Sequence, residues 1–179
     1  MSRIRLVPVV FILIMTFSVL FGAFVAYRQF KLVGPLQNEL QAIPGVQTAQ
    51  VETGNPSLVK IKLGPVPKLA NQDLQSTYVK IVGIISGVFS GTNNLDIVDN
   101  QDQELTSAYE SFQPILLEGI AKGNFVEMIA AVEQKASQAG IQARVTMDVH
   151  NIYIQLSKGN HYLYDVFQYT TLRQGGGTP

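Results

Sequence analysis

The feature that most constrains this chain is an uncharged and almost wholly apolar segment near its start, residues 6–27. As a helix, these 22 residues would be about 33 Å long at roughly 1.5 Å per residue, close to the roughly 30 Å hydrocarbon core of a bilayer. Water solvates such a surface poorly. The segment therefore predicts a transmembrane helix that anchors the rest of the chain, preceded by a short tail, residues 1–5.

A cleaved signal peptide is the rival interpretation of this segment. Its apolar stretch exceeds the roughly 7–15 residues of a signal-peptide core. Phe24 and Phe21 would occupy the −3 positions for cuts after Ala26 and Ala23, where small residues are needed. We therefore expect an uncleaved signal-anchor.

The charges that flank the anchor predict its orientation. Arg3, Arg5 and the α-amino group precede it, whereas Arg28 and Lys31 follow it. Because the more basic flank favours the cytoplasm, we expect a cytoplasmic N-terminus and an extracytoplasmic C-terminal domain. Cytoplasmic placement of that domain is the open alternative.

The composition excludes several classes of protein. The 13 basic and 13 acidic side chains balance, so no excess charge attracts nucleic acid, and 46% hydrophobic residues argue against disorder. The chain has no cysteine, which excludes disulfide scaffolds and thiol catalysis. With no cysteine and only two histidines, we expect no metal site. We also expect no cofactor and, because the charges balance, no nucleic-acid partner.

Beyond the anchor, residues 28–44 are expected to form a juxtamembrane linker with a short helix, and residues 45–173 a single α+β domain. Hydrophobic periodicity predicts strands over 46–52, 58–63, 95–98, 141–149 and 152–156, and helices over 71–91, 103–121, 124–139 and 161–173. The first long helix is expected to be capped by Asn71. The tail, residues 174–179, is expected to be disordered.

The order helix–strand–strand–helix recurs at an offset of 95 residues, in units of about 35–98 and 124–173. Blocks 45–64 and 140–159 each begin and end with glycine. Two such units predict helices on a mainly antiparallel sheet, and whether the units share one sheet is left open. This order resembles that of membrane-anchored periplasmic scaffold domains in secretion and pilus machines and of ring-building domains in sporulation assemblies, a likeness of fold that does not by itself assign a function.

Two apolar features are candidate interfaces. Gly83, Gly87 and Gly91 recur every four residues in a helix, which favours either tight packing on the sheet or an exposed face for a partner. Tyrosines crowd near the C-terminus, where a helix could not bury all of them on one face, so some rings are expected to be exposed at an interface, with core packing as the open alternative. Those taken as interface candidates are Tyr153, Tyr162, Tyr164 and Tyr169.

Acidic residues dominate the stretch between Lys80 and Lys122: Asp96, Asp99, Asp102, Glu104, Glu110 and Glu118. An acid before Gln103 is typical of a helix N-cap, an interpretation favoured over a calcium loop because no EF-hand spacing is present. A solvated face is the ordinary reading of the other acids. We also count Asp99, Asp102 and Glu104 as a candidate docking surface for a basic partner.

The chain carries no recognisable catalytic constellation. His150 lies beside Asp148, and His161 would share a helical face with Asp165, but no nucleophile or metal-ligand motif accompanies either pair. We therefore expect a non-enzymatic scaffold or assembly protein that binds other membrane or envelope proteins, or itself. A membrane-tethered sensor or ligand-binding module is the second hypothesis, and an enzyme a distant third.

Overall fold

The computed structural model describes residues 6–28, 33–52, 54, 57–89 and 93–169. Five α-helices and two three-stranded sheets make up this part of the chain, so the α+β class is confirmed. The helices are α1 Leu6–Arg28, α2 Gly34–Gln41, α3 Leu74–Val88, α4 Gln103–Lys122 and α5 Phe125–Gln138. The strands are β1 Val46–Glu52, β2 Ser57–Leu63, β3 Asn93–Val98, β4 Gln142–Met147, β5 Asn151–Lys158 and β6 His161–Gln168.

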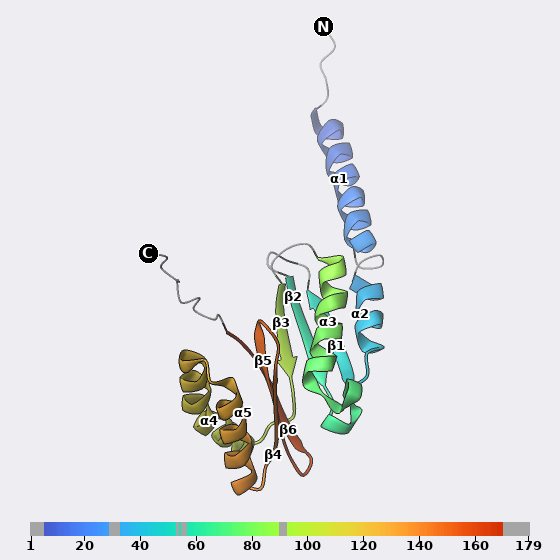
Figure 1. Cartoon of the computed structure of the whole chain (residues 1–179). Helices are drawn as coiled ribbons and strands as arrows, with labels where there is room; N and C mark the ends of the chain where they lie inside the picture. The colour runs from blue at the N-terminus through green and yellow to red at the C-terminus, as the bar shows by residue number, and fades with distance from the viewer. Residues whose placement is uncertain (1–5, 29–32, 53, 55–56, 90–92, 170–179) are drawn as a thin grey trace, which may run out of the picture.

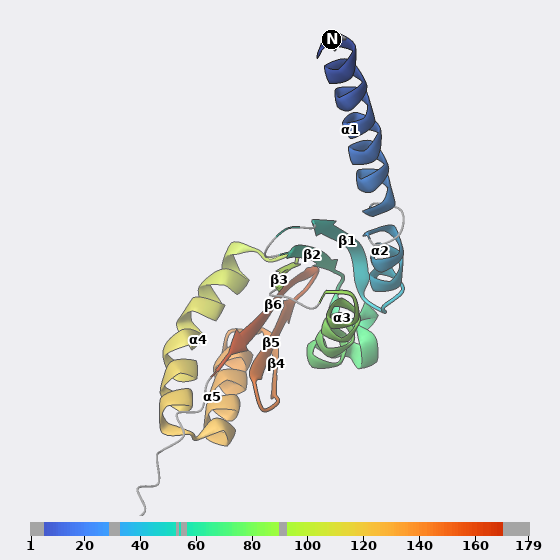
Figure 2. The same cartoon turned by 90° about the horizontal axis from the view of Figure 1, so that it is seen from above.

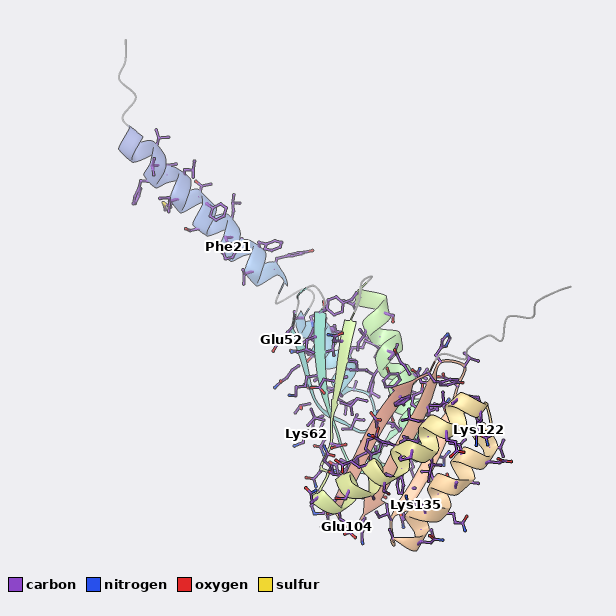
Figure 3. The ribbon with its side chains drawn as sticks, turned by 90° about the vertical axis from the view of Figure 1, so that its left-hand side faces the viewer. Phe21, Glu52, Lys62, Glu104, Lys122 and Lys135 are labelled. Atoms are coloured by element: carbon purple, nitrogen blue, oxygen red, sulfur yellow. The ribbon has the colours of Figure 1, made fainter. Side chains whose placement is uncertain are left out.

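Helix α1 projects away from the rest of the protein (Figure 1; Figure 3, where Phe21 marks it). Its large apolar side chains between Val9 and Val25 are each 50% to 69% exposed, and none of them belongs to either hydrophobic core. In the part of the chain that the structure describes, no helix is both long and apolar enough to cross a membrane. The predicted helix is therefore present, and its transmembrane character stays a prediction.

The first sheet, β1–β2–β3, has one covered face and one open face. Strand β2 pairs antiparallel with β1 and parallel with β3. Its side chains alternate as the sequence predicts: Val59, Ile61 and Leu63 are buried, whereas Lys60 and Lys62 are exposed. Helices α2 and α3 cover the apolar face through Leu36, Leu40, Leu74, Ile81 and Ile85. The polar face remains open, and Lys62 lies on it in Figure 3.

The second sheet, β4–β5–β6, is antiparallel and lies between two sets of helices (Figure 2). Tyr153, Tyr162 and Tyr164 extend from one face into the core formed by α2, α3 and the first sheet. Ile154 and Leu163, on the other face, pack against α4 and α5. This sheet contributes to both hydrophobic cores, and so it joins the two halves of the domain.

The predicted C-terminal helix over 161–173 is wrong, because residues 161–168 form strand β6. A hairpin joins it to β5, with Lys158 paired to His161 across Gly159 and Asn160. Gly159 adopts a φ of +58°, which two-residue hairpins require and glycine supplies at little cost. Neighbouring residues of a strand face opposite sides, so both faces of β6 bury apolar side chains and no single helical face is needed.

The question of whether the two units share one sheet is answered by the structure: there are two sheets, whose pairings are antiparallel except for the parallel β2–β3 pair. One finer expectation about the first half of the domain changes. The cap of α3 is Asp73, whose Oδ2 accepts the N–H of Ser76 at 2.8 Å, and not Asn71. The tail 174–179, Gly91, Arg3, Arg5 and Lys31 lie outside the described residues.

Candidate functional site between the two sheets

The two sheets meet where β3 and the following loop approach β6. Among the described residues, one backbone hydrogen bond joins them, from the N–H of Tyr162 to the carbonyl oxygen of Asn100 at 3.2 Å. The hydroxyls of Tyr162 and Tyr164 donate to the carbonyl oxygens of Leu63 (3.1 Å) and Gly64 (2.9 Å) at the end of β2. Side chains of β6 therefore hold the second sheet against the first.

Both tyrosines are predicted interface residues that the structure buries. Tyr162 is 6% exposed and Tyr164 5%, and their ring centroids lie 5.3 Å apart. Burial raises the pKa of both hydroxyls, so both remain protonated donors at neutral pH. Of the two interpretations that the sequence left open, core packing holds for these two rings: the contact they make lies within the chain.

Asp99 ends the pairing between the sheets. Its Oδ2 accepts the backbone N–H of Tyr164 at 2.8 Å, a group that a neighbouring strand would otherwise bind. Burial raises the pKa of this carboxyl, and the hydrogen bond from Tyr164 offsets only part of that effect. A side chain thus replaces a strand at this point of the β6 edge.

Beyond Asp99 the strands leave a hollow of about 220 Å³ between them, which we call the seam. It is lined by Tyr78, Leu95, Asp96, Ile97, Tyr164, Asp165 and Val166. Small-molecule sites usually occupy about 300–1,000 Å³. The seam therefore offers little support to the hypothesis of a ligand-binding sensor.

The two carboxylates of the seam have partners on different elements. Asp96 lies 3.7 Å from Lys60 on the open face of the first sheet, where both side chains are about half exposed. Asp165 accepts the hydroxyl of Tyr109 on α4. The desolvated Tyr109 hydroxyl has a raised pKa, to which this hydrogen bond adds, so the hydroxyl stays a donor at neutral pH.

Acidic side chains of residues 96–118 make separate local contacts. Asp102 caps α4, as the sequence predicts, by accepting the N–H of Leu105 at 2.8 Å. Glu104 pairs with Lys158, and Glu118 with Lys122 one turn along the same helix. These contacts account for most of the acidic stretch as capping and surface pairing, and a docking surface for a basic partner stays a prediction.

Tyr153 and Tyr169 gather at the β4–β5 turn. The Tyr153 hydroxyl donates to Asp148 Oδ2 at 2.6 Å, and the Tyr169 hydroxyl donates to the Asp148 carbonyl oxygen at 2.6 Å. Desolvation raises the pKa of Asp148, but the hydrogen bonds from Tyr153 and from the N–H groups of His150 and Asn151 outweigh it and lower that pKa below its usual value. The cluster fixes the turn.

The histidines form no catalytic arrangement with the aspartates singled out in the sequence. His161 and Asp165 lie four residues apart in a strand and not on a helical face, and His161 instead approaches Asp102 at 4.0 Å. In the described ranges, no group of three or more histidine, aspartate or glutamate side chains is placed to hold a metal ion.

Gly83 and Gly87 lie on the exposed face of α3, where an added Cβ would meet no atom within 4 Å. Of the two interpretations of this pair, tight packing on the sheet is therefore wrong. The close helix approach occurs at Gly119 on α4, where a Cβ would lie 2.5 Å from the Cβ of Met128 on α5. No pattern in the sequence singles out Gly119, because its partner lies on another helix.

Comparison with known proteins identifies no relative: no protein family, curated protein or solved structure gives a significant match to this chain.

Proposed function

We propose that the chain is a bitopic membrane protein in which α1 is the anchor and the α+β domain mediates protein–protein contacts in an envelope complex. The observation that carries this proposal is the surface of α1. Its described apolar side chains are at least half exposed, whereas the apolar side chains of the domain collect in two buried cores. A helix with such a surface needs an apolar solvent.

The sequence of the whole segment 6–27 supports the same proposal. Its 22 uncharged residues match a bilayer core of about 30 Å, and its more basic N-terminal flank favours the cytoplasm. The domain would then face the extracytoplasmic side, about five residues of chain beyond the end of α1 at Arg28.

The interaction role is supported by surfaces that the fold leaves uncovered. The open face of the first sheet exposes Gln50, Lys60 and Lys62, and α3 exposes Val79 and Val88 beside its glycines. Protein–protein contacts in multi-subunit assemblies use faces and strand edges of this kind.

The membrane part of the proposal is tested by charging α1. In Leu13→Arg with Ile14→Arg, two charges at the centre of the anchor each cost about 2.5–3.5 kcal/mol on insertion scales. We expect this variant to leave the membrane fraction on extraction with alkaline carbonate. The matched control is Val126→Arg, because Val126 is equally apolar and 83% exposed, but lies on α5. The proposal is wrong if all three proteins wash off alike.

Topology and assembly need separate readouts. A compartment reporter fused after Pro179 should be active outside the cytoplasm, and activity only in the cytoplasm would reverse the orientation. Cross-linking in intact membranes should trap a discrete partner or oligomer. A strictly monomeric product over a wide range of cross-linker concentrations would argue against a scaffold.

A further inference from the structure

We infer that an extended segment of a partner protein pairs along the open edge of β6 beside β3 and places its side chains in the seam. The segment has apolar side chains on one face and basic side chains on the other. This inference names a partner class for the interaction role above and so rests on that proposed function.

The backbone of β6 offers a row of hydrogen-bonding groups toward the seam. The N–H of Tyr162 is bound by Asn100, and the N–H of Tyr164 by the Asp99 carboxylate. Because outward-facing groups recur at every second residue of a strand, Val166 is next in this row. Among the described residues, no hydrogen bond from β3 reaches Val166, so an added strand would meet free groups there.

The outer edge of β4 is covered by a side chain, whereas the edge of β6 at the seam is largely open. On β4, the outer N–H of Val145 donates to the carboxylate of Glu133 on α5 at 3.1 Å, so a side chain occupies the edge. At the seam, Asp99 occupies one position and the hollow begins beyond it. Unpaired strand edges that face each other are sites where an extended peptide can bind through its main chain.

The two sides of the seam define the side chains that the segment needs. Leu95, Ile97 and Val166 pack against the apolar core on the α3 side and favour apolar partners. Asp96 and Asp165 bring negative charge to the same hollow and favour lysine or arginine. In a strand these requirements alternate residue by residue.

Strand β2 shows that β3 accepts such a neighbour on its paired edge. Its sequence alternates Val59, Lys60, Ile61 and Lys62, and it pairs with β3 so that Lys60 lies beside Asp96. We therefore use the peptide Ser-Leu-Val-Lys-Ile-Lys-Leu, the sequence of residues 57–63, as the probe for the free edge.

The absence of cysteine from the chain allows the experiment to locate the peptide. The full chain in detergent micelles carries either Asn94→Cys, at the seam edge of the first sheet, or Gln50→Cys, at its opposite edge. Both positions are exposed on edge strands, so Gln50→Cys is the matched control. Probe peptides with a cysteine at either end are incubated with each protein in a glutathione redox buffer, and the mixed disulfides are quantified.

We expect trapping at residue 94 to be at least about tenfold more efficient than at residue 50, because bound peptide raises the effective thiol concentration. A peptide with both lysines replaced by glutamate should lose this preference. Asp96→Asn should weaken binding of the cysteine-free probe about two- to fivefold, as expected for one exposed ion pair. Equal trapping at both positions, or trapping that is indifferent to the lysines, would overturn the inference.

This experiment separates the inference from the function on which it rests. If seam trapping fails while cross-linking in membranes still yields a discrete partner, the domain binds that partner through another surface. If both fail, the interaction role fails as well.

Discussion

Gly119→Ala should destabilise the protein, although alanine favours helices. A Cβ at residue 119 would lie 2.5 Å from both Cβ and Cγ of Met128 and 2.7 Å from its Sδ. Since the Met128 Cβ is fixed to the backbone of α5, no rotamer of Met128 removes the clash. Helices α4 and α5 would have to separate, and Met128 and Leu116 would lose packing in the second core.

The magnitude follows from two opposing effects. Replacing glycine by alanine within a helix stabilises by about 0.5–1 kcal/mol, whereas overpacking a well-packed core costs about 1–3 kcal/mol. At Gly83 only the first effect operates, because a Cβ there meets no atom within 4 Å. The gain from helix propensity cancels between the two variants, so Gly119→Ala should be less stable than Gly83→Ala by about 1–3 kcal/mol.

Urea unfolding of the full chain in detergent micelles measures this difference. Tyrosine fluorescence is a suitable probe, since the chain has seven tyrosines and no tryptophan. Gly87→Ala is a second control on the open face of α3 and should behave as Gly83→Ala does. If Gly119→Ala raises the free energy of unfolding as much as these controls, the close approach of α4 and α5 is wrong.

Three further predictions concern the seam and its surroundings. Tyr164→Phe should lower the free energy of unfolding by about 1–3 kcal/mol, because it leaves the buried carbonyl of Gly64 without its donor, while Tyr27→Phe on exposed α1 should have no effect in the same urea titration. Asp102→Ala should cost about 1 kcal/mol through loss of the α4 cap, measured by thermal unfolding. The raised pKa of Asp99 means that its contribution to stability is present below the unfolded pKa of about 3.9 and is lost as pH rises through the folded value. Asp99→Asn should therefore gain stability relative to wild type as pH rises from about 3.9 through the raised folded pKa of Asp99, and a difference that does not vary with pH would contradict this.

Local patterns predicted most of the regular elements. The alternation of Val59, Lys60, Ile61 and Lys62 located β2, and the apolar stripe through Met128 and Val132 located α5. These patterns depend on residues a few positions apart, so a short stretch of sequence is enough to predict the element. Strand pairing depends on residues far apart in the sequence, and the parallel pairing of β2 with β3, which α3 separates in the chain, was not predicted.

The candidate residues were harder to interpret than the elements. A helix over 161–173 could not bury all of its tyrosines on one face, so it predicts that some rings are exposed; in strand β6 both Tyr162 and Tyr164 are buried. Gly83 and Gly87 have the spacing of a packing motif, but spacing cannot show which face of a helix meets the core. Asp102 was predicted correctly as a cap because capping involves only neighbouring residues.

The repeat at an offset of 95 residues shows how the seam arises. Helix α2 and strands β1 and β2 correspond to α5, β4 and β5, but the next element is helix α3 in one unit and strand β6 in the other. The two units diverge after Gly64 and Gly159, respectively. Pro65 follows the first glycine, with a φ of −64°, and has no N–H for a ladder, so the chain continues away through two short 3₁₀ turns.

Asn160 follows the second glycine, and Gly159 at a φ of +58° closes a tight hairpin. The returning strand β6 then has one edge paired with β5 and a second edge directed at β3. The two units thus differ in the residue that follows the glycine. Where it is Pro65, the chain continues to a helix that covers the sheet; where it is Asn160, the chain returns as a strand with a new edge. The seam is a direct consequence of that difference.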